Sequence, residues 1–203
     1  AHPITMKMTF GEDARIFGAQ AVGHKGVEKR IDVIATAIKG KLNIYDLQDL
    51  ELSYAPPYSS GKDPVNILGY AASNILDGML KTIQYYEVDQ LTAAGNILVD
   101  VRQPEELSLG GIKGAINIPL PQLRSRLEEL PKDKPIYITC QIGLRGYLAV
   151  RILAQNGYEA INLDGGYRTY ASVYGISRKE KEDCKVRIDD TGEAFLECPG
   201  PSA

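Results

Sequence analysis

The sequence of 203 residues has no tryptophan, two histidines and three cysteines. An odd number of cysteines, Cys140, Cys184 and Cys198, spread over the C-terminal third, does not indicate a disulfide framework and favours a reducing compartment, the cytoplasm. Lysine and arginine number 23 against 26 acidic residues, and no basic face is apparent, so nucleic-acid binding is not expected. No apolar run reaches membrane-spanning length, no signal peptide begins the chain and no metal site is predicted.

A dinucleotide-binding fingerprint is also missing. No Gly-x-Gly-x-x-Gly follows a strand, so we expect this chain by itself to bind neither FAD nor NAD(P)H. The chain begins Ala1-His2-Pro3 without a methionine and enters a strand at once, which indicates a piece of something longer. Its 44% hydrophobic residues are enough for one large or two modest cores.

In the first eighty residues, the spacing of apolar residues is first that of β-strands and then that of helices. Apolar residues alternate over 4–10, and a turn at 11–13 leads into a second strand over 15–22, which predicts a hairpin. Helical spacing over 27–38 ends at Gly40, and Asp63-Pro64 begins a helix that ends near Asp77-Gly78. The predicted order is strands, helix, loop and helix, an α+β unit.

The most informative feature is Cys140, which lies between a strand-like stretch, 135–139, and a helix-like stretch, 147–156. Backbone N–H groups of the connecting loop and the positive end of the helix stabilise an anion at this point, here a thiolate or a persulfide. The loop residues that would bind the substrate are Gln141, Ile142, Gly143 and Leu144, and Arg145 follows them. The alternative is a buried cysteine that ends a strand as a small hydrophobe.

Three further runs support the first interpretation: Asn96 to Arg102, Gly114 to Pro119 and Ile161 to Tyr167. With the Cys140 loop, they resemble a rhodanese (sulfurtransferase) domain over residues 83–174. The resemblance implies an α/β fold with a central parallel sheet, in which Cys140 takes a sulfane sulfur and carries it as a persulfide. This chain departs from the family twice, since 109–114 has no histidine and Gly146 follows the loop arginine.

The first eighty residues carry a second resemblance. The segments 26–35 and 54–66 are similar to the C-terminal dimerisation domain of pyridine nucleotide-disulfide oxidoreductases, above all coenzyme A disulfide reductase and its rhodanese-fused persulfide or polysulfide reductase relatives. This implies that residues 1–80 form a homodimer and that Tyr54 faces the active-site cysteine of the partner subunit. Without the family, Tyr54 would be an aromatic residue packed on the prolines after it.

The same resemblance predicts what the rest of the protein needs. The full-length parent would have N-terminal flavin domains, FAD, NAD(P)H and coenzyme A, and its substrate would be a small persulfide or a coenzyme A disulfide. Such a parent is an NAD(P)H-dependent flavin oxidoreductase, a class that includes NADH oxidases, and none of these cofactors is expected to bind the present chain alone.

Residues 175–203 are predicted to be a charged linker followed by a strand over 185–189. The end, Cys198-Pro199-Gly200-Pro201, resembles the start of small sulfur-carrier proteins, in which Cys198 would accept sulfur. The alternative is a plain tail, and Cys184 is interpreted as a linker cysteine.

We therefore expect an enzyme in which Cys140 attacks a sulfane sulfur and Arg145 organises the loop or attracts the donor. Asp100 and Arg102 are interpreted as framework. One rival is a phosphatase of the same fold, but its loop has five residues between cysteine and arginine, and here there are four. The other rival is a non-catalytic dimerisation and regulatory module.

Overall fold

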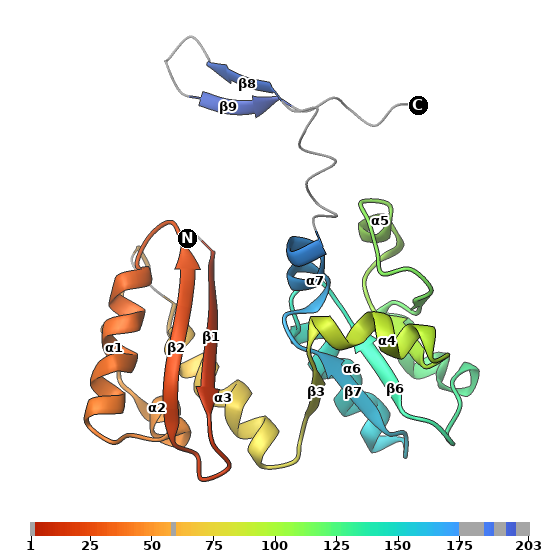
Figure 1. The fold of residues 1–203 in the computed structure, drawn as a ribbon, viewed down its shortest axis with the longest axis horizontal. Coiled ribbons are helices and arrows are strands. Elements are labelled where there is room, and N and C mark those ends of the chain that lie inside the picture. The colour runs from red at the N-terminus through yellow and green to blue at the C-terminus, as the bar shows by residue number, and fades with distance from the viewer. Residues whose placement is uncertain (1–2, 58–59, 175–184, 189–193, 198–203) are drawn as a thin grey trace. The chain divides into compact units, whose positions relative to one another are not determined.

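A computed structural model describes residues 3–57, 60–174, 185–188 and 194–197 (Figure 1). The chain divides into two compact units, Ala1–Leu80 and Lys81–Ala203. Each unit is described by itself below. Among the described residues, no helix is both long and apolar enough to cross a membrane.

The first unit opens with an antiparallel hairpin. Strand β1 (Ile4–Phe10) pairs with β2 (Ile16–Gly23) from Ile4↔Gly23 to Phe10↔Ile16. Half-buried and exposed residues alternate along β1, which is the pattern that predicted a strand with one face on the core. The predicted hairpin is confirmed to within one residue at each strand end.

Three helices cover the hairpin. Helices α1 (Val27–Lys39) and α3 (Pro64–Leu76) match the predicted positions, and their core residues include Ile34 and Val65. The predicted loop between them was wrong in one part, because it contains the short helix α2 (Ile44–Asp49). This helix has only six residues, too few to show a helical period, and it begins with a reciprocal cap between the Asn43 side chain and Asp46.

A buried ion pair joins two of these helices. Arg30 of α1 donates to both carboxylate oxygens of Asp63, at 3.3 and 2.8 Å. Asp63 also caps α3 by accepting the N–H of Val65. The Asp63 carboxylate thus accepts hydrogen bonds both from the first turn of α3 and from the buried Arg30 guanidinium. A charged group can be buried in a core only when it is paired and hydrogen-bonded in this way.

The second unit is built on one parallel sheet of five strands in the order β3-β7-β6-β4-β5. Strands β4 and β6 are buried almost throughout, as expected of a parallel sheet with helices on both faces. The strands are β3 (Lys81–Ile83), β4 (Ile97–Asp100), β5 (Ile116–Asn117), β6 (Ile136–Thr139) and β7 (Ala160–Leu163).

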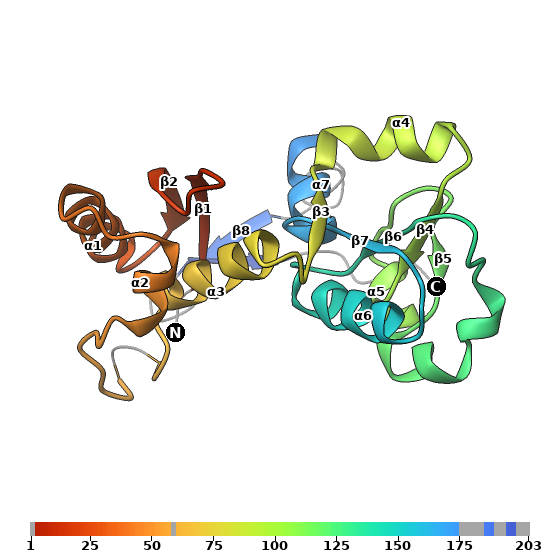
Figure 2. The same cartoon turned by 90° about the horizontal axis from the view of Figure 1, so that it is seen from below.

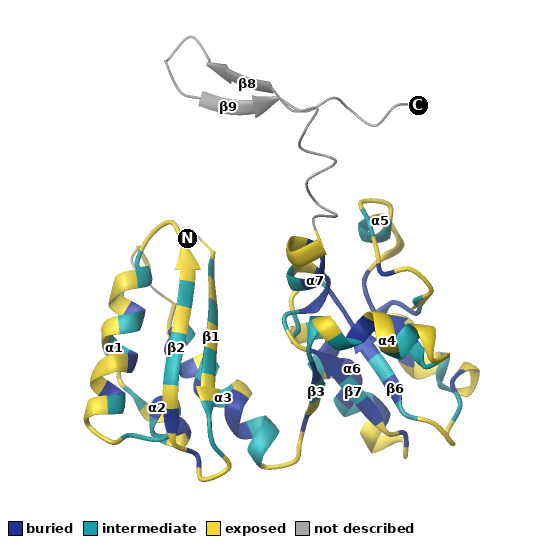
Figure 3. Cartoon of the chain, in the orientation of Figure 1, coloured by how far each residue is buried: buried dark blue, intermediate teal, exposed yellow. Residues whose placement is uncertain are grey.

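Helices lie on both faces of this sheet, with α4 and α7 on one side and α6 on the other (Figure 2). Leu98, Tyr137 and Ile161 are neighbours across the strands and face α4 and α7. The helical elements are η1 (Tyr85–Glu87), α4 (Val88–Ala93), α5 (Pro104–Leu107), η2 (Leu120–Ser125), η3 (Leu127–Glu129), α6 (Leu144–Gln155) and α7 (Gly166–Tyr174). Figure 3 shows buried residues gathered along the strands between these helices, whereas much of the outer surface of the helices is exposed.

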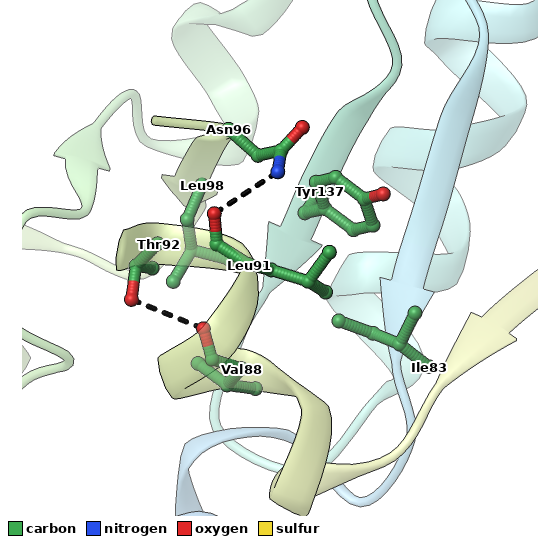
Figure 4. Close-up of a pocket in the computed structure, with 7 residues that line it drawn as sticks. All are labelled: Ile83, Val88, Leu91, Thr92, Asn96, Leu98 and Tyr137. Atoms are coloured by element: carbon green, nitrogen blue, oxygen red, sulfur yellow. Dashed lines mark hydrogen bonds between the residues drawn. The ribbon is translucent and has the colours of Figure 1, made fainter. Parts of the chain in front are cut away.

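The α4 side packs without a ligand-sized space. Seven residues, among them Leu91, Leu98 and Tyr137, line a pocket with a volume of about 10 Å³ (Figure 4). This volume is about the least that one water molecule needs. This face of the sheet is therefore part of the hydrophobic core.

The tail contains two further strands, β8 (Lys185–Ile188) and β9 (Ala194–Glu197), which pair antiparallel. The first confirms the strand predicted over 185–189 to within one residue. Cys184 and Cys198 lie outside the described residues, so the prediction for Cys198 stays a prediction.

Candidate functional site

The carboxyl ends of three neighbouring strands bring the sequence motifs together. Strand β4 pairs with β6, with Asp100 opposite Thr139, and β6 pairs with β7. The segments that follow these strands begin at Val101, Cys140 and Asp164, and they therefore leave the sheet at the same edge. In parallel α/β sheets this edge is where ligands bind.

Cys140 is the residue directly after β6, and it is 1% exposed. The N–H of Gly143 donates to its Sγ atom at 3.1 Å, so the sulfur faces the loop. Gly143 has φ 114°, a conformation that side chains rarely adopt. Helix α6 begins at Leu144, three residues before the predicted Tyr147, so the positive end of the helix lies directly behind the loop.

The main chain of the loop is held from α7. The N–H of Tyr167 donates to the carbonyl of Cys140 at 2.7 Å, and the N–H of Arg168 donates to the carbonyl of Gln141 at 3.0 Å. Gly166 has φ +60°, and a Cβ atom there would lie 2.5 Å from the carbonyl oxygen of Cys140. The first turn of α7 can approach the loop this closely only because residue 166 is a glycine.

Arg102 is buried beside the loop and links three segments. It donates to both oxygens of Asp100, to the carbonyl of Gly110 at 2.9 Å and to Oε1 of Gln141 at 3.2 Å. Its guanidinium lies 4.2 Å from the centre of the Tyr167 ring. The contacts of Asp100 and Arg102 are thus structural. Through the carbonyl of Gly110, Arg102 also holds the segment 109–114, in which this chain has no histidine.

Arg145 turns toward Glu106 of α5. Its two terminal nitrogens donate to the two carboxylate oxygens at 2.6 Å each, and both side chains are 32% exposed. This hydrogen bonding lowers the pKa of Glu106 to about 2, helped by the N–H of Gln103. The hydrogen bonds that Arg145 donates to Glu106 raise the pKa of Arg145, and the negative charges of Glu106, Cys140 and Asp100 raise it further.

Two apolar side chains of the loop are exposed to solvent. Ile142 is 58% exposed and Leu144 is 65% exposed. Both belong to the loop that the sequence predicted to bind the substrate. An exposed apolar pair beside a buried thiol suits an uncharged part of a small donor better than a highly charged one.

The second departure from the family pattern has a structural partner. A Cβ atom on Gly146 would clash with Oδ1 of Asn162, which is buried and has no hydrogen-bond partner among the described residues. The amide nitrogen of Asn162 approaches the carbonyl of Gly143 at 3.4 Å. The glycine therefore makes room for an asparagine that contacts the loop from β7.

Several of these residues were not predicted. Glu106, Asn162 and Arg168 were missed, and for Glu106 the only signal was a helix start, Pro104-Glu105-Glu106. Tyr54 lies in the first unit and is 57% exposed, and it lines a polar pocket of about 250 Å³ together with Ser53, Lys62 and Asp63 among others. Within the described residues, no group of three or more His, Cys, Asp or Glu residues could hold a metal ion.

Comparison with known proteins agrees with this geometry. The rhodanese-like domain family matches residues 85–172. The chain contains a rhodanese-like domain. The family assignment covers the whole parallel sheet apart from β3, and it includes the Cys140 loop.

The chain is also similar to reductases. It is 56% identical, with a TM-score of 0.85, to reduced Bacillus anthracis CoADR-RHD, over 87% of this chain and 32% of that one. It is 39% identical, with a TM-score of 0.74, to a NAD-dependent persulfide reductase from A. fulgidus, over 82% of this chain and 30% of that one. A coenzyme A disulfide reductase from Staphylococcus epidermidis is 42% identical over 71 residues, 34% of this chain and 16% of that protein.

Two facts follow from these figures. Since the second unit begins at Lys81, matches over 82–87% of the chain have to include part of the first unit. The chain also spans about a third or less of these three relatives. The chain thus corresponds to one part of larger homologues, which include proteins named coenzyme A disulfide reductase, and its rhodanese-like domain is matched over residues 85–172.

Proposed function

We propose that this chain is the sulfurtransferase part of a flavin-dependent reductase of coenzyme A disulfides or persulfides, and that Cys140 carries the sulfur. The observation that carries the proposal is the hydrogen bond from the N–H of Gly143 to Sγ of Cys140 at 3.1 Å. The bond lies at the start of α6, where the helix end favours a negative charge. A thiolate and a persulfide are both anions, so one arrangement serves the enzyme before and after the transfer.

The reaction is a displacement at sulfur. The Cys140 thiolate attacks the outer sulfur of a donor R–S–S⁻, a new S–S bond forms, and the old S–S bond breaks. Its electron pair leaves with R–S⁻, which takes a proton, so that Cys140–S⁻ + R–S–S⁻ + H⁺ gives Cys140–S–S⁻ + R–SH. An acceptor thiol removes the sulfur by the same exchange, so the chain needs no cofactor for this step.

The loop residues have distinct roles in this proposal. Gly143 supplies the N–H to the sulfur, and Gln141 is held through its side chain by Arg102 and through its carbonyl by α7. Arg145 organises the loop, because its guanidinium is engaged by Glu106. Ile142 and Leu144 flank the approach of the donor.

We further propose that residues 1–80 are the dimerisation domain of the parent and that 83–174 are its transfer domain. The exposed apolar residues Phe17, Val22 and Ile67 of the first unit would be covered by the partner subunit, and Tyr54 would meet its flavin-side cysteine. Sedimentation of the full-length parent should show a dimer, and a strict monomer would contradict this part.

FAD and NAD(P)H belong to the parent in this proposal. Among the described residues, two strand-to-helix junctions do not fit them, because the junction after β4 is filled by the buried Arg102 side chain and the junction after β6 is centred on Cys140. Neither has the open glycine turn that a pyrophosphate requires. We expect the upstream sequence of the parent to contain two dinucleotide-binding fingerprints and one active-site cysteine.

Turnover of a sulfane sulfur donor tests the proposal. The chain should transfer sulfur from a low-molecular-weight persulfide to an acceptor thiol, Cys140→Ser should abolish the transfer, and Cys184→Ser should retain it. Loss in Cys184→Ser with retention in Cys140→Ser would reject the assignment. Cys140-dependent hydrolysis of an aryl phosphate would instead favour the phosphatase, and inactivity with every donor would favour the regulatory module.

A further inference from the structure

Two guanidinium groups flank the Cys140 loop, and each is already paired. Arg102 holds Asp100 at 2.8 Å, and Arg145 holds Glu106 through two contacts of 2.6 Å. The positive charge of each arginine is thus balanced by the negative charge of its own carboxylate partner. The loop thus offers an anion its N–H groups and the end of α6, without a free cation among these arginines.

We propose that Glu106 is a positioning residue that sets the charge of the donor: by holding Arg145, it makes the loop accept sulfane sulfur from weakly charged donors in preference to dianionic ones. The inference rests on the proposed function and deepens it. It assigns a role to a carboxylate that lies 39 residues from Arg145 in the sequence and that no motif pointed to.

The contacts of Glu106 hold it in this role. It is the third residue of α5, and one of its oxygens also accepts the N–H of Gln103 at 3.0 Å. Arg145 lies in the first turn of α6, so the two partners belong to helices that follow the adjacent strands β4 and β6 at the same sheet edge. The carboxylate, with a pKa of about 2, remains ionised throughout the neutral range, and the pair persists with it.

The physical effect follows from Coulomb's law. A dianion feels any nearby charge twice as strongly as a monoanion of the same shape. Removing the negative charge of Glu106 leaves Arg145 as an uncompensated cation whose charge already interacts with that of Cys140. The loop should then attract a dianion more than a monoanion, by an amount that salt reduces because the pair is a third exposed.

Two donors of nearly equal shape undergo the same reaction but differ in charge. Thiosulfate carries two negative charges and gives Cys140–S⁻ + S–SO₃²⁻ → Cys140–S–S⁻ + SO₃²⁻. Methanethiosulfonate carries one and gives Cys140–S⁻ + CH₃SO₂–S⁻ → Cys140–S–S⁻ + CH₃SO₂⁻. In each case the donor S–S bond breaks and its electron pair leaves with the oxidised sulfur.

The experiment measures the rate constant of persulfide formation at Cys140 with both donors at low salt, from quenched mass spectra. In Glu106→Gln, the ratio of the thiosulfate to the methanethiosulfonate rate constant should rise about five- to tenfold over wild type. Glutamine keeps the N-terminal cap of α5. Adding salt should shrink the difference.

Two further variants sharpen the result. Glu105→Gln removes a charge from the exposed neighbouring residue of α5 and should leave the ratio unchanged, and Glu106→Asp keeps the charge and should stay near wild type. An unchanged ratio in Glu106→Gln, or an equal rise in Glu105→Gln, would overturn the inference while leaving the proposed function standing. Failure of both donors to load Cys140 in wild type would overturn the inference, and failure of a low-molecular-weight persulfide as well would overturn the proposed function.

Discussion

The Cys140 loop and the segment that carries Tyr54 are the two candidate sites of this chain, and they differ in how complete they are. Cys140 is 1% exposed and receives contacts from its own unit, through Gly143, Tyr167 and Arg102. Tyr54 is 57% exposed in the other unit. In the proposal above, the first site functions within one unit, whereas Tyr54 acts only together with the partner subunit.

Core truncations in the two units test this contrast most strongly. Ile34→Ala in the first unit and Ile138→Ala in β6 each remove a side chain that is almost fully buried, which should lower the free energy of unfolding by about 2–5 kcal/mol. Urea unfolding measures the loss. Sulfur loading of the folded protein should suffer in Ile138→Ala and stay normal in Ile34→Ala, and equal loss in both would remove the independence of the Cys140 site.

The support of the loop by α7 can be broken at one atom. Gly166→Ala places a Cβ atom 2.5 Å from the carbonyl of Cys140 at φ +60°, which should cost about 1–3 kcal/mol for the backbone conformation alone and slow the loading of Cys140. Gly157→Ala is the control, because φ there is +81° and nothing lies within 4 Å of the added atom. Thermal melts should show loss of stability in both, and normal loading in Gly166→Ala would mean that the contact does not position the loop.

Acid should weaken the Arg145–Glu106 pair. The pKa of Glu106 is lowered in the folded state to about 2, so the pair stabilises the protein above the ordinary carboxyl pKa and loses its contribution as the pH falls toward 2. Because both side chains are a third exposed, we expect about 1 kcal/mol. The stability difference between wild type and Glu106→Gln should be full at pH 6 and shrink below about pH 4.5. If the stability difference between wild type and Glu106→Gln grows on acidification, the ion pair does not stabilise the folded protein.

The smallest effect is expected at Tyr54. Tyr54→Phe should change the stability of this chain by less than about 0.5 kcal/mol, since the residue is exposed, and it should leave the loading of Cys140 unchanged. In the full-length parent, the same substitution should slow the reduction of disulfides or persulfides. If the parent is unaffected, Tyr54 has a packing role only.

The sequence predicted the elements whose signals are local. Alternation over 4–10 located β1, and Asp63-Pro64 marked the start of α3 to the residue. Helix α2 was missed because six residues do not show a period, although Asn43 followed by Asp46 was a usable cap signal. Helix α6 was placed three residues late, because it begins directly after Gly143 and the end of the cysteine motif, Leu144 and Arg145, lies in its first turn.

The candidate site was predictable only in part, for a related reason. Cys140 is marked by its place between a strand and a helix, which is local information. The pairing of Arg145 with Glu106 depends on β4 lying next to β6, and the fit of Asn162 against Gly146 depends on β7 lying next to β6. Contacts across a parallel sheet join residues far apart in the sequence, and no pattern along the chain records them.

The most direct test of the account is the mass of this chain after incubation with a persulfide or polysulfide donor. The account predicts the addition of one sulfur atom that maps to Cys140, is lost on reduction, is absent in Cys140→Ser and is retained in Cys184→Ser and Cys198→Ser. Sulfur confined to Cys184 or Cys198, with Cys140 unmodified, would contradict it.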